Sequence, residues 1–239
     1  ACGLALSVRS LTPEAKVVER RAWIALFNAN RDILIRTLAM LFCFAWFVRS
    51  GAQLGTEYVA GNEVLLQFIT VAAFVLDGFA FVAEKEVGEA YGARDRRRLT
   101  RAMRLTTELA LAFAVLISLA YWLGGGWIIS NFIRDEDARL VALTFLPYCA
   151  LVPIIGVLAY QLDGFLLGAT RGRALRIAAG IVTLIYIPLD LILRDAFGNT
   201  GVWLAFLGMF VIRVIAHGWF LPGLMRATAD PPQPLQQPS

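Results

Sequence analysis

The stretch Leu109–Ile133, LALAFAVLISLAYWLGGGWIISNFI, contains no charged side chain. A helix needs about 17–25 predominantly apolar residues to cross the hydrocarbon core of a bilayer, so this stretch is long enough. Its apolar residues are continuous, whereas the strands of a membrane barrel alternate between apolar and polar residues. The stretch therefore predicts a transmembrane helix, and this prediction decides the class of fold for the whole chain.

Five further stretches have the same character, and each holds at most two side chains that are charged or histidine. They are Thr37–Thr56, Val64–Ala83, Leu140–Leu162, Ile177–Leu193 and Ala196–Met225. The chain of 239 residues is 59% hydrophobic and 17% charged, whereas a soluble domain is about 25% charged. This composition excludes an ordinary soluble domain. We predict an all-α membrane protein in which six transmembrane helices form one lobe.

The basic residues between these stretches predict the orientation of the chain in the membrane. If the N-terminal segment is cytoplasmic, 17 of the 22 Lys and Arg residues fall on the cytoplasmic side and four on the other, with Arg213 inside a span. Cytoplasmic loops of membrane proteins carry an excess of Lys and Arg. The sequence therefore predicts that both termini are cytoplasmic.

The lobe is expected to occupy residues 31–226. Residues 1–30 mix apolar and charged side chains, which predicts the tail of a preceding span followed by an interfacial linker. Residues 227–239 are rich in Pro and Gln and are expected to be disordered. The chain starts with Ala-Cys-Gly rather than Met, so we expect a fragment or a processed product.

The tetrapeptide Leu-Asp-Gly-Phe occurs twice in these apolar stretches and contributes Asp77 and Asp163. Each Asp lies eight residues before the next cation, Lys85 or Arg171, which places both at a depth of about 12 Å if the segments are parallel helices. A carboxylate in a membrane span usually faces a cavity, a pathway or a partner. We predict that both carboxylates exchange protons or bind cations. The alternative is a structural role in which each one hydrogen-bonds a neighbouring helix.

Other polar residues have less specific patterns. Tyr160, Gln161 and Gln67 are candidates for shaping the ion-coupling or substrate-binding site, although Gln67 lies more than two helical turns before Asp77. Glu84 lies at the inner end of its span, where an interfacial ion pair and a pathway role are both open.

The sequence also allows predictions about the surroundings of three ionisable residues in the last two spans. Asp190 is expected to reach interfacial water, and Arg213 to offset a buried acid whose identity the sequence does not give. His217 is the single histidine, and we expect a packed or interfacial role for it rather than a proton relay.

No pattern of catalytic or cofactor-binding residues is present in the sequence, so we expect neither an enzyme nor a bound cofactor or metal. The net charge of +4 is explained by topology rather than by binding of nucleic acid. The arginines of Arg94–Arg104 could bind anionic lipid, but we favour a block of charge that sets topology. The small-residue pairs Gly88-x-x-x-Gly92 and Gly164-x-x-x-Gly168 predict close helix packing.

Several of these stretches resemble the spans of MATE multidrug exporters, in particular the DNA-damage-inducible, DinF-like branch. The similar stretches lie within residues 30–38 (seventh span), 62–68 and 76–93 (eighth), 162–170 (tenth), and 198–205 together with Arg213 (twelfth). Proteins of that family have twelve spans in two six-helix lobes. The resemblance implies that this chain corresponds to the C-terminal lobe.

The resemblance also implies a function, which is export of organic cations driven by entry of protons or sodium. The best-known coupling carboxylate of the DinF-like branch lies in the first span of the other lobe. The sodium-coupled branch uses acids on the seventh and tenth spans. Asp163 matches the tenth-span region, whereas the seventh-span stretch of this chain has no carboxylate at mid-membrane. We therefore expect proton coupling, in a multi-pass protein of the bacterial inner membrane whose partners are the bilayer, small-molecule substrates and the missing N-terminal lobe.

Two other functions remain open from the sequence. The chain could be a non-transporting fragment or a membrane-embedded partner subunit. It could also belong to the lipid flippases of the same superfamily, which a strongly cationic cavity would favour; the two central acids favour the antiporter.

The predicted topology is testable by cysteine accessibility. We expect a single cysteine placed within 94–98 to be protected from a membrane-impermeant thiol reagent in intact cells, and one placed within 134–137 to be labelled. Labelling of the first position in intact cells would reverse the assigned orientation.

Overall fold

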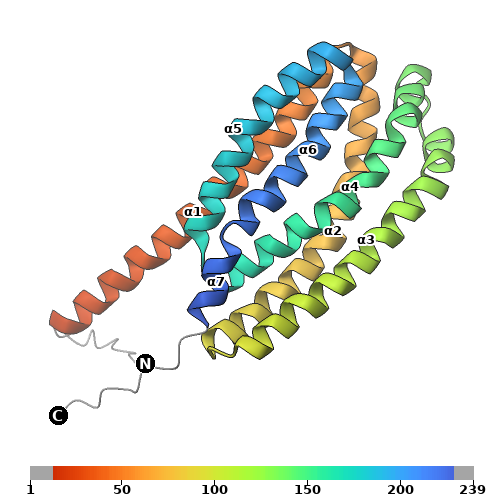
Figure 1. The fold of residues 1–239 in the computed structure, drawn as a ribbon. Helices are drawn as coiled ribbons and strands as arrows, with labels where there is room; N and C mark the ends of the chain where they lie inside the picture. The colour runs from red at the N-terminus through yellow and green to blue at the C-terminus, as the bar shows by residue number, and fades with distance from the viewer. Residues whose placement is uncertain (1–12, 229–239) are drawn as a thin grey trace, which may run out of the picture.

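The computed structural model describes the backbone of residues 13–228 and the side chains of residues 30–228. This part of the chain forms seven α-helices (Figure 1). They are α1 (Pro13–Ala52), α2 (Thr56–Gly92), α3 (Arg96–Phe132), α4 (Glu136–Gly168), α5 (Gly172–Phe197), α6 (Asn199–Gly218) and α7 (Leu221–Ala227).

The prediction of six spans is confirmed, because six helical segments of the described chain are long and apolar enough to cross a membrane. Most helices extend beyond the apolar stretches that identified them. The stretch Val64–Ala83, for example, lies within the longer α2. The last stretch was placed wrongly at one end: Gly198, with a φ of 58°, ends α5 and precedes α6, so Ala196 belongs to α5. A positive φ favours glycine, and this residue provides the sharp turn between the two helices.

The expected boundaries can be followed only in part. Residues 13–29 belong to α1, which continues without a break into the first span and extends beyond the rest of the bundle at its N-terminal end (Figure 1). Residues 1–12 of the expected linker lie outside the described residues, and so do residues 229–239 of the expected tail.

The helices form an elongated bundle in which α4 occupies a central position (Figure 1). It contacts α2, α3 and α6, while α1 packs mainly on α5, and α5 on α6. The short turns α2–α3 and α4–α5 lie at the same end of the bundle, which we call the basic end because Arg94–Arg104 and Arg171–Arg176 lie there. The turns α1–α2, α3–α4 and α5–α6 lie at the opposite end.

A close helix contact joins α2 and α4 through glycines. A Cβ atom on Gly164 would overlap the carbonyl oxygen of Ala80, and one on Gly168 would overlap the carbonyl oxygen of Glu84. Small residues let two helix backbones approach in this way. The expected role of Gly164-x-x-x-Gly168 in packing is therefore confirmed.

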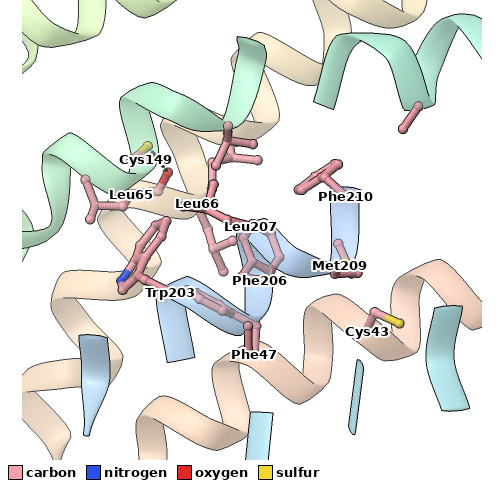
Figure 2. Packing of buried hydrophobic residues seen from close by; sticks show 14 of the residues in the cluster. Cys43, Phe47, Leu65, Leu66, Cys149, Trp203, Phe206, Leu207, Met209 and Phe210 are labelled. Carbon is pink, nitrogen blue, oxygen red and sulfur yellow. Dashed lines mark hydrogen bonds between the residues drawn. The ribbon is translucent and has the colours of Figure 1, made fainter. Parts of the chain in front are cut away.

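Aromatic side chains fill the core between α1, α2 and α6. The ring of Phe206 lies 4.6 Å from that of Phe47 and 5.4 Å from that of Phe210, measured between centroids. Trp203 is fully buried beside them, and Leu65 of α2 closes the cluster (Figure 2). Large side chains that pack at this density leave little freedom for the helices to rotate.

A hydrogen-bonded amide pair fastens α2 to α6 near the opposite end. The side chains of Asn62 and Asn199 donate to each other over 2.8 and 3.1 Å, and the indole N–H of Trp203 donates to Asn62 Oδ1 over 2.9 Å. All three side chains are buried. Because every member is neutral and hydrogen-bonded, the network specifies the pairing of these helices without burying a charge.

The two glycines of the repeated tetrapeptide make a matched pair for testing the α2–α4 contact. We expect Gly164→Ala to lower the free energy of unfolding by about 1–3 kcal/mol, because the new methyl group meets backbone. No neighbouring atom lies within 4 Å of a Cβ built on Gly78. Gly78→Ala should therefore leave stability unchanged or raise it by up to about 1 kcal/mol through helix propensity. Unfolding of both variants in mixed micelles would show the difference, and equal effects would contradict the assigned contact.

Candidate functional site

Four helices bring ionisable side chains together inside the bundle. Arg36 comes from α1, Asp77 from α2, Asp163 from α4, and Arg213 and His217 from α6. We call these five residues the ion cluster. Such residues are rare in membrane interiors, where they pair with one another and mark functional sites.

Asp163 is the centre of the ion cluster and is only 3% exposed. Its Oδ2 accepts hydrogen bonds from the guanidinium groups of both Arg36 and Arg213. Its Oδ1 lies 2.9 Å from Nε2 of His217. One carboxylate thus connects α4 to α1 and α6, and the partner that the sequence left unidentified for Arg213 is Asp163.

His217 lies between two acceptors. Its Nδ1 is 2.6 Å from the carbonyl oxygen of Arg213, one turn earlier on α6, and its Nε2 faces the carboxylate of Asp163. A neutral imidazole carries one proton and can donate to only one of the two, whereas an imidazolium donates to both.

A pocket of about 210 Å³ adjoins the ion cluster between α1, α2, α4 and α6. It is lined by Arg36, Thr37, Met40, Phe44, Ala73, Asp77, Tyr160 and Arg213. Asp77 is half-buried and forms part of its wall, while Asp163 lies behind the two arginines. The pocket therefore presents one carboxylate directly and reaches the second only through the guanidinium groups that hold it.

Three of the residues singled out in the sequence meet here. Asp77 and Asp163 lie in one cluster, as the matched depth of the two tetrapeptides suggests. Tyr160 is buried, and its ring centroid lies 5.2 Å from the guanidinium carbon of Arg213. A cation over an aromatic face at this distance is attracted by the ring quadrupole, so Tyr160 helps to fix the arginine.

The other three candidates do not enter the pocket wall. Gln67 is exposed on α2, with its amide 3.4 Å from Glu63. Glu84 is half-buried near the basic end of α2. Gln161 is buried beside Tyr160 in the chain, and neither polar atom of its amide has a hydrogen-bond partner within the described residues.

Arg36 and His217 were missed as site residues. In the sequence, Arg36 was counted only among the basic residues that set topology, because a cation near the start of a span usually has that role. For His217 a signal exists: it follows Arg213 by four residues, so the two share one face of a helix. The expectation of a merely packed histidine overlooked this spacing.

The expectation that Asp190 reaches interfacial water is wrong. The side chain is fully buried. It accepts hydrogen bonds from Ser50 Oγ over 2.5 Å and from Trp46 Nε1 over 2.9 Å, and Arg194 lies 3.9 Å away. Trp46 and Ser50 belong to α1, which covers this face of α5. A second ion pair, Asp32–Arg176, joins the same two helices nearer the basic end.

Comparison with known proteins gives a consistent result. The family model described as MatE matches residues 33–192. The DNA damage-inducible protein F of Escherichia coli is 33% identical over 87% of this chain and 45% of its own length. A probable multidrug resistance protein NorM of Aromatoleum aromaticum is 24% identical over 87% of this chain and 46% of its length. The chain therefore spans about half the length of the curated relatives it matches.

Solved structures agree on the fold. The outward-facing conformation of a multidrug resistance MATE family transporter of the MOP superfamily superimposes with a TM-score of 0.75 at 17% identity, over 82% of this chain and 44% of that one. An inward-facing conformation gives a TM-score of 0.67 at 19% identity, over 82% and 46%. At this level of identity the match establishes the six-helix fold as close to half of such a transporter.

The ion cluster predicts a large energetic difference between two arginines. Arg213→Gln should lower the free energy of unfolding by about 3–5 kcal/mol, because Asp163 stays buried with one fewer cation. Arg139→Gln removes a surface pair with Glu136 of 3.3 Å and should cost at most about 1 kcal/mol. Unfolding in mixed micelles gives both values. Adding Asp163→Asn to Arg213→Gln should recover part of the loss, and a purely additive result would contradict the pairing.

Proposed function

Because this chain belongs to the MatE family of membrane transporters, we propose that it forms the C-terminal lobe of a proton-coupled antiporter that exports organic cations. The observation that carries the proposal is the pocket with Asp77 in its wall and Asp163 behind Arg36 and Arg213. Membership of a transporter family also means that the chain is not an enzyme.

The composition of the pocket suits an organic cation. A carboxylate, Asp77, lies beside the aromatic side chains of Phe44 and Tyr160. Cationic ligands are recognised by aromatic faces together with acidic groups. Such a ligand would compete with the two arginines for the negative charge of the ion cluster.

Charge balance explains how protons could drive release. With Asp77 and Asp163 ionised, their two negative charges equal the two positive charges of Arg36 and Arg213. Protonation of Asp77, the carboxyl that lines the pocket, makes the cluster net positive. A net positive pocket repels a bound cation. Entry of protons and exit of the substrate cation are therefore opposed at the same site, which is the requirement for antiport.

The geometry favours protons over sodium as the coupling ion. A sodium ion at Asp163 would approach a carboxylate that already accepts from two guanidinium groups. Like a proton, it would add a positive charge where two are present, but it would also need further oxygen ligands. A proton needs no such ligands, because it binds to the carboxyl oxygen itself.

The distribution of basic residues supports an orientation with the basic end in the cytoplasm. Arg94–Arg104 and Arg171–Arg176 flank the turns α2–α3 and α4–α5 at this end. We propose that both termini lie on this side. The relative from Escherichia coli is bacterial, which supports location in a bacterial inner membrane.

Transport by the complete two-lobe protein tests the proposal. Asp163→Asn and Asp77→Asn should each lower uptake of a fluorescent organic cation, driven by an imposed pH gradient, by at least about tenfold in proteoliposomes. Binding of the cation should strengthen with rising pH in the unsubstituted protein, since ionised carboxylates attract it. In Asp77→Asn this pH dependence should be reduced, because Asp77 is the carboxyl that lines the pocket. Asp137→Asn, which changes an exposed acid at the opposite end, is the matched control.

The same proteoliposomes distinguish the alternatives. Alternating access requires one repeat to move against another, so this chain alone should not transport. Gradient-driven uptake by the chain alone, abolished by Asp163→Asn, would instead establish a half-transporter. Absence of transport by the two-lobe protein would leave the non-transporting subunit, and movement of a fluorescent lipid in place of the cation would indicate a flippase.

A further inference from the structure

Two depressions of opposite character meet on the outer face of α3 near the basic end. The first, of about 660 Å³, is lined by Arg96, Arg97, Thr100, Arg101 and Arg104. The second, of about 420 Å³, runs on from it between α3, α4 and α7 and is walled mainly by apolar side chains, including Met103, Leu111, Phe165, Leu221 and Met225. Thr100 and Arg104 line both, so the two are continuous.

The arginines of the first depression are available to an external anion. Arg96, Arg97 and Arg101 are exposed, and none has an ion-pair partner among residues 30–228. Arg104 donates from Nε to Glu108 over 2.7 Å, and its terminal nitrogens donate to no group among residues 30–228. Arg98 differs, because it pairs with Glu89 over 2.5 Å on another face of the helix.

The order of side chains along α3 matches the order of groups in a phospholipid. Arg97, Arg101 and Arg104 follow one another at spacings of four and three residues, so they share a face, and Leu111 continues this face two turns later. The distance from Arg97 to Leu111 along the helix is about 21 Å. Leu111 lies inside the charge-free stretch of α3, which begins at Leu109, whereas the other α3 residues of the groove lie between Thr100 and Glu108, beside the arginines. The arginines therefore lie at the level of the headgroups, and the groove leads from that level toward the acyl chains.

We propose that this composite groove binds an anionic phospholipid of the surrounding bilayer, with its phosphate between Arg97, Arg101 and Arg104 and one acyl chain in the groove. A block of charge that only sets topology explains the arginines but not the apolar groove that continues from them. Leu221 and Met225 belong to α7, so the bound lipid holds α7 against α3. The assignment is independent of what the lobe transports.

Lipid binding by the purified chain tests the proposal directly. In detergent, native mass spectrometry should show phosphatidylglycerol binding at least about tenfold more tightly than phosphatidylcholine. The double variant Arg97→Gln/Arg101→Gln should weaken the binding of phosphatidylglycerol by about ten- to thirtyfold. The control Arg94→Gln/Arg173→Gln removes two exposed arginines from the same end and should change the affinity less than threefold.

Two further measurements separate this site from simpler explanations. Leu111→Trp fills the groove without changing its charge and should also weaken the binding of phosphatidylglycerol. Glycerol phosphate, which carries the anionic group without acyl chains, should not compete. Equal losses in the two double variants would show a general attraction to basic surface and would overturn the proposal. Competition by glycerol phosphate, or unchanged binding in Leu111→Trp, would overturn it as well.

Discussion

The ion pairs of Asp163 are the interaction on which the arrangement of this lobe depends. The acid belongs to the central helix α4, and all of its cationic partners come from α1 and α6. Removing charges from water costs several kcal/mol per ion, and their attraction only partly offsets this cost. The cluster is therefore better understood as specifying which helices meet at this depth than as a source of net stability.

The sequence was sufficient to predict the helices but not to predict which helices pair with one another. Six spans could be predicted because an apolar stretch such as Leu109–Ile133 has one stable solution in a bilayer, a helix. Arg36 and Arg213, the partners of Asp163, are separated from it by 127 and 50 residues. The residues near Asp163 in the sequence do not indicate these contacts. Asp190 shows the same limit. The side chains that bury it, Trp46 and Ser50, belong to another helix, so the sequence around Asp190 does not indicate its burial.

The repeated tetrapeptide shows that an identical motif does not imply an identical environment. Gly164 lies against the backbone of α2, whereas Gly78 faces open space. The neighbouring acids differ accordingly, because Asp163 is enclosed and Asp77 forms part of a pocket wall. Both copies lie at the same distance in sequence from the next cation, so their similar depth could be predicted. Which side of each helix faces a neighbour depends on packing, and the tetrapeptide itself does not contain this information.

The amide pair of Asn62 and Asn199 has a mechanical consequence. At this level α2 and α6 are joined by neutral amide groups, whereas deeper in the bundle α4 is joined to α6 and α1 by ion pairs. A ligand that competes for the charge of Asp163 therefore acts on one attachment and leaves the other in place. The lobe thus holds α6 at one level by neutral hydrogen bonds and at another level by charge, and only the second attachment is open to competition from a cation in the pocket.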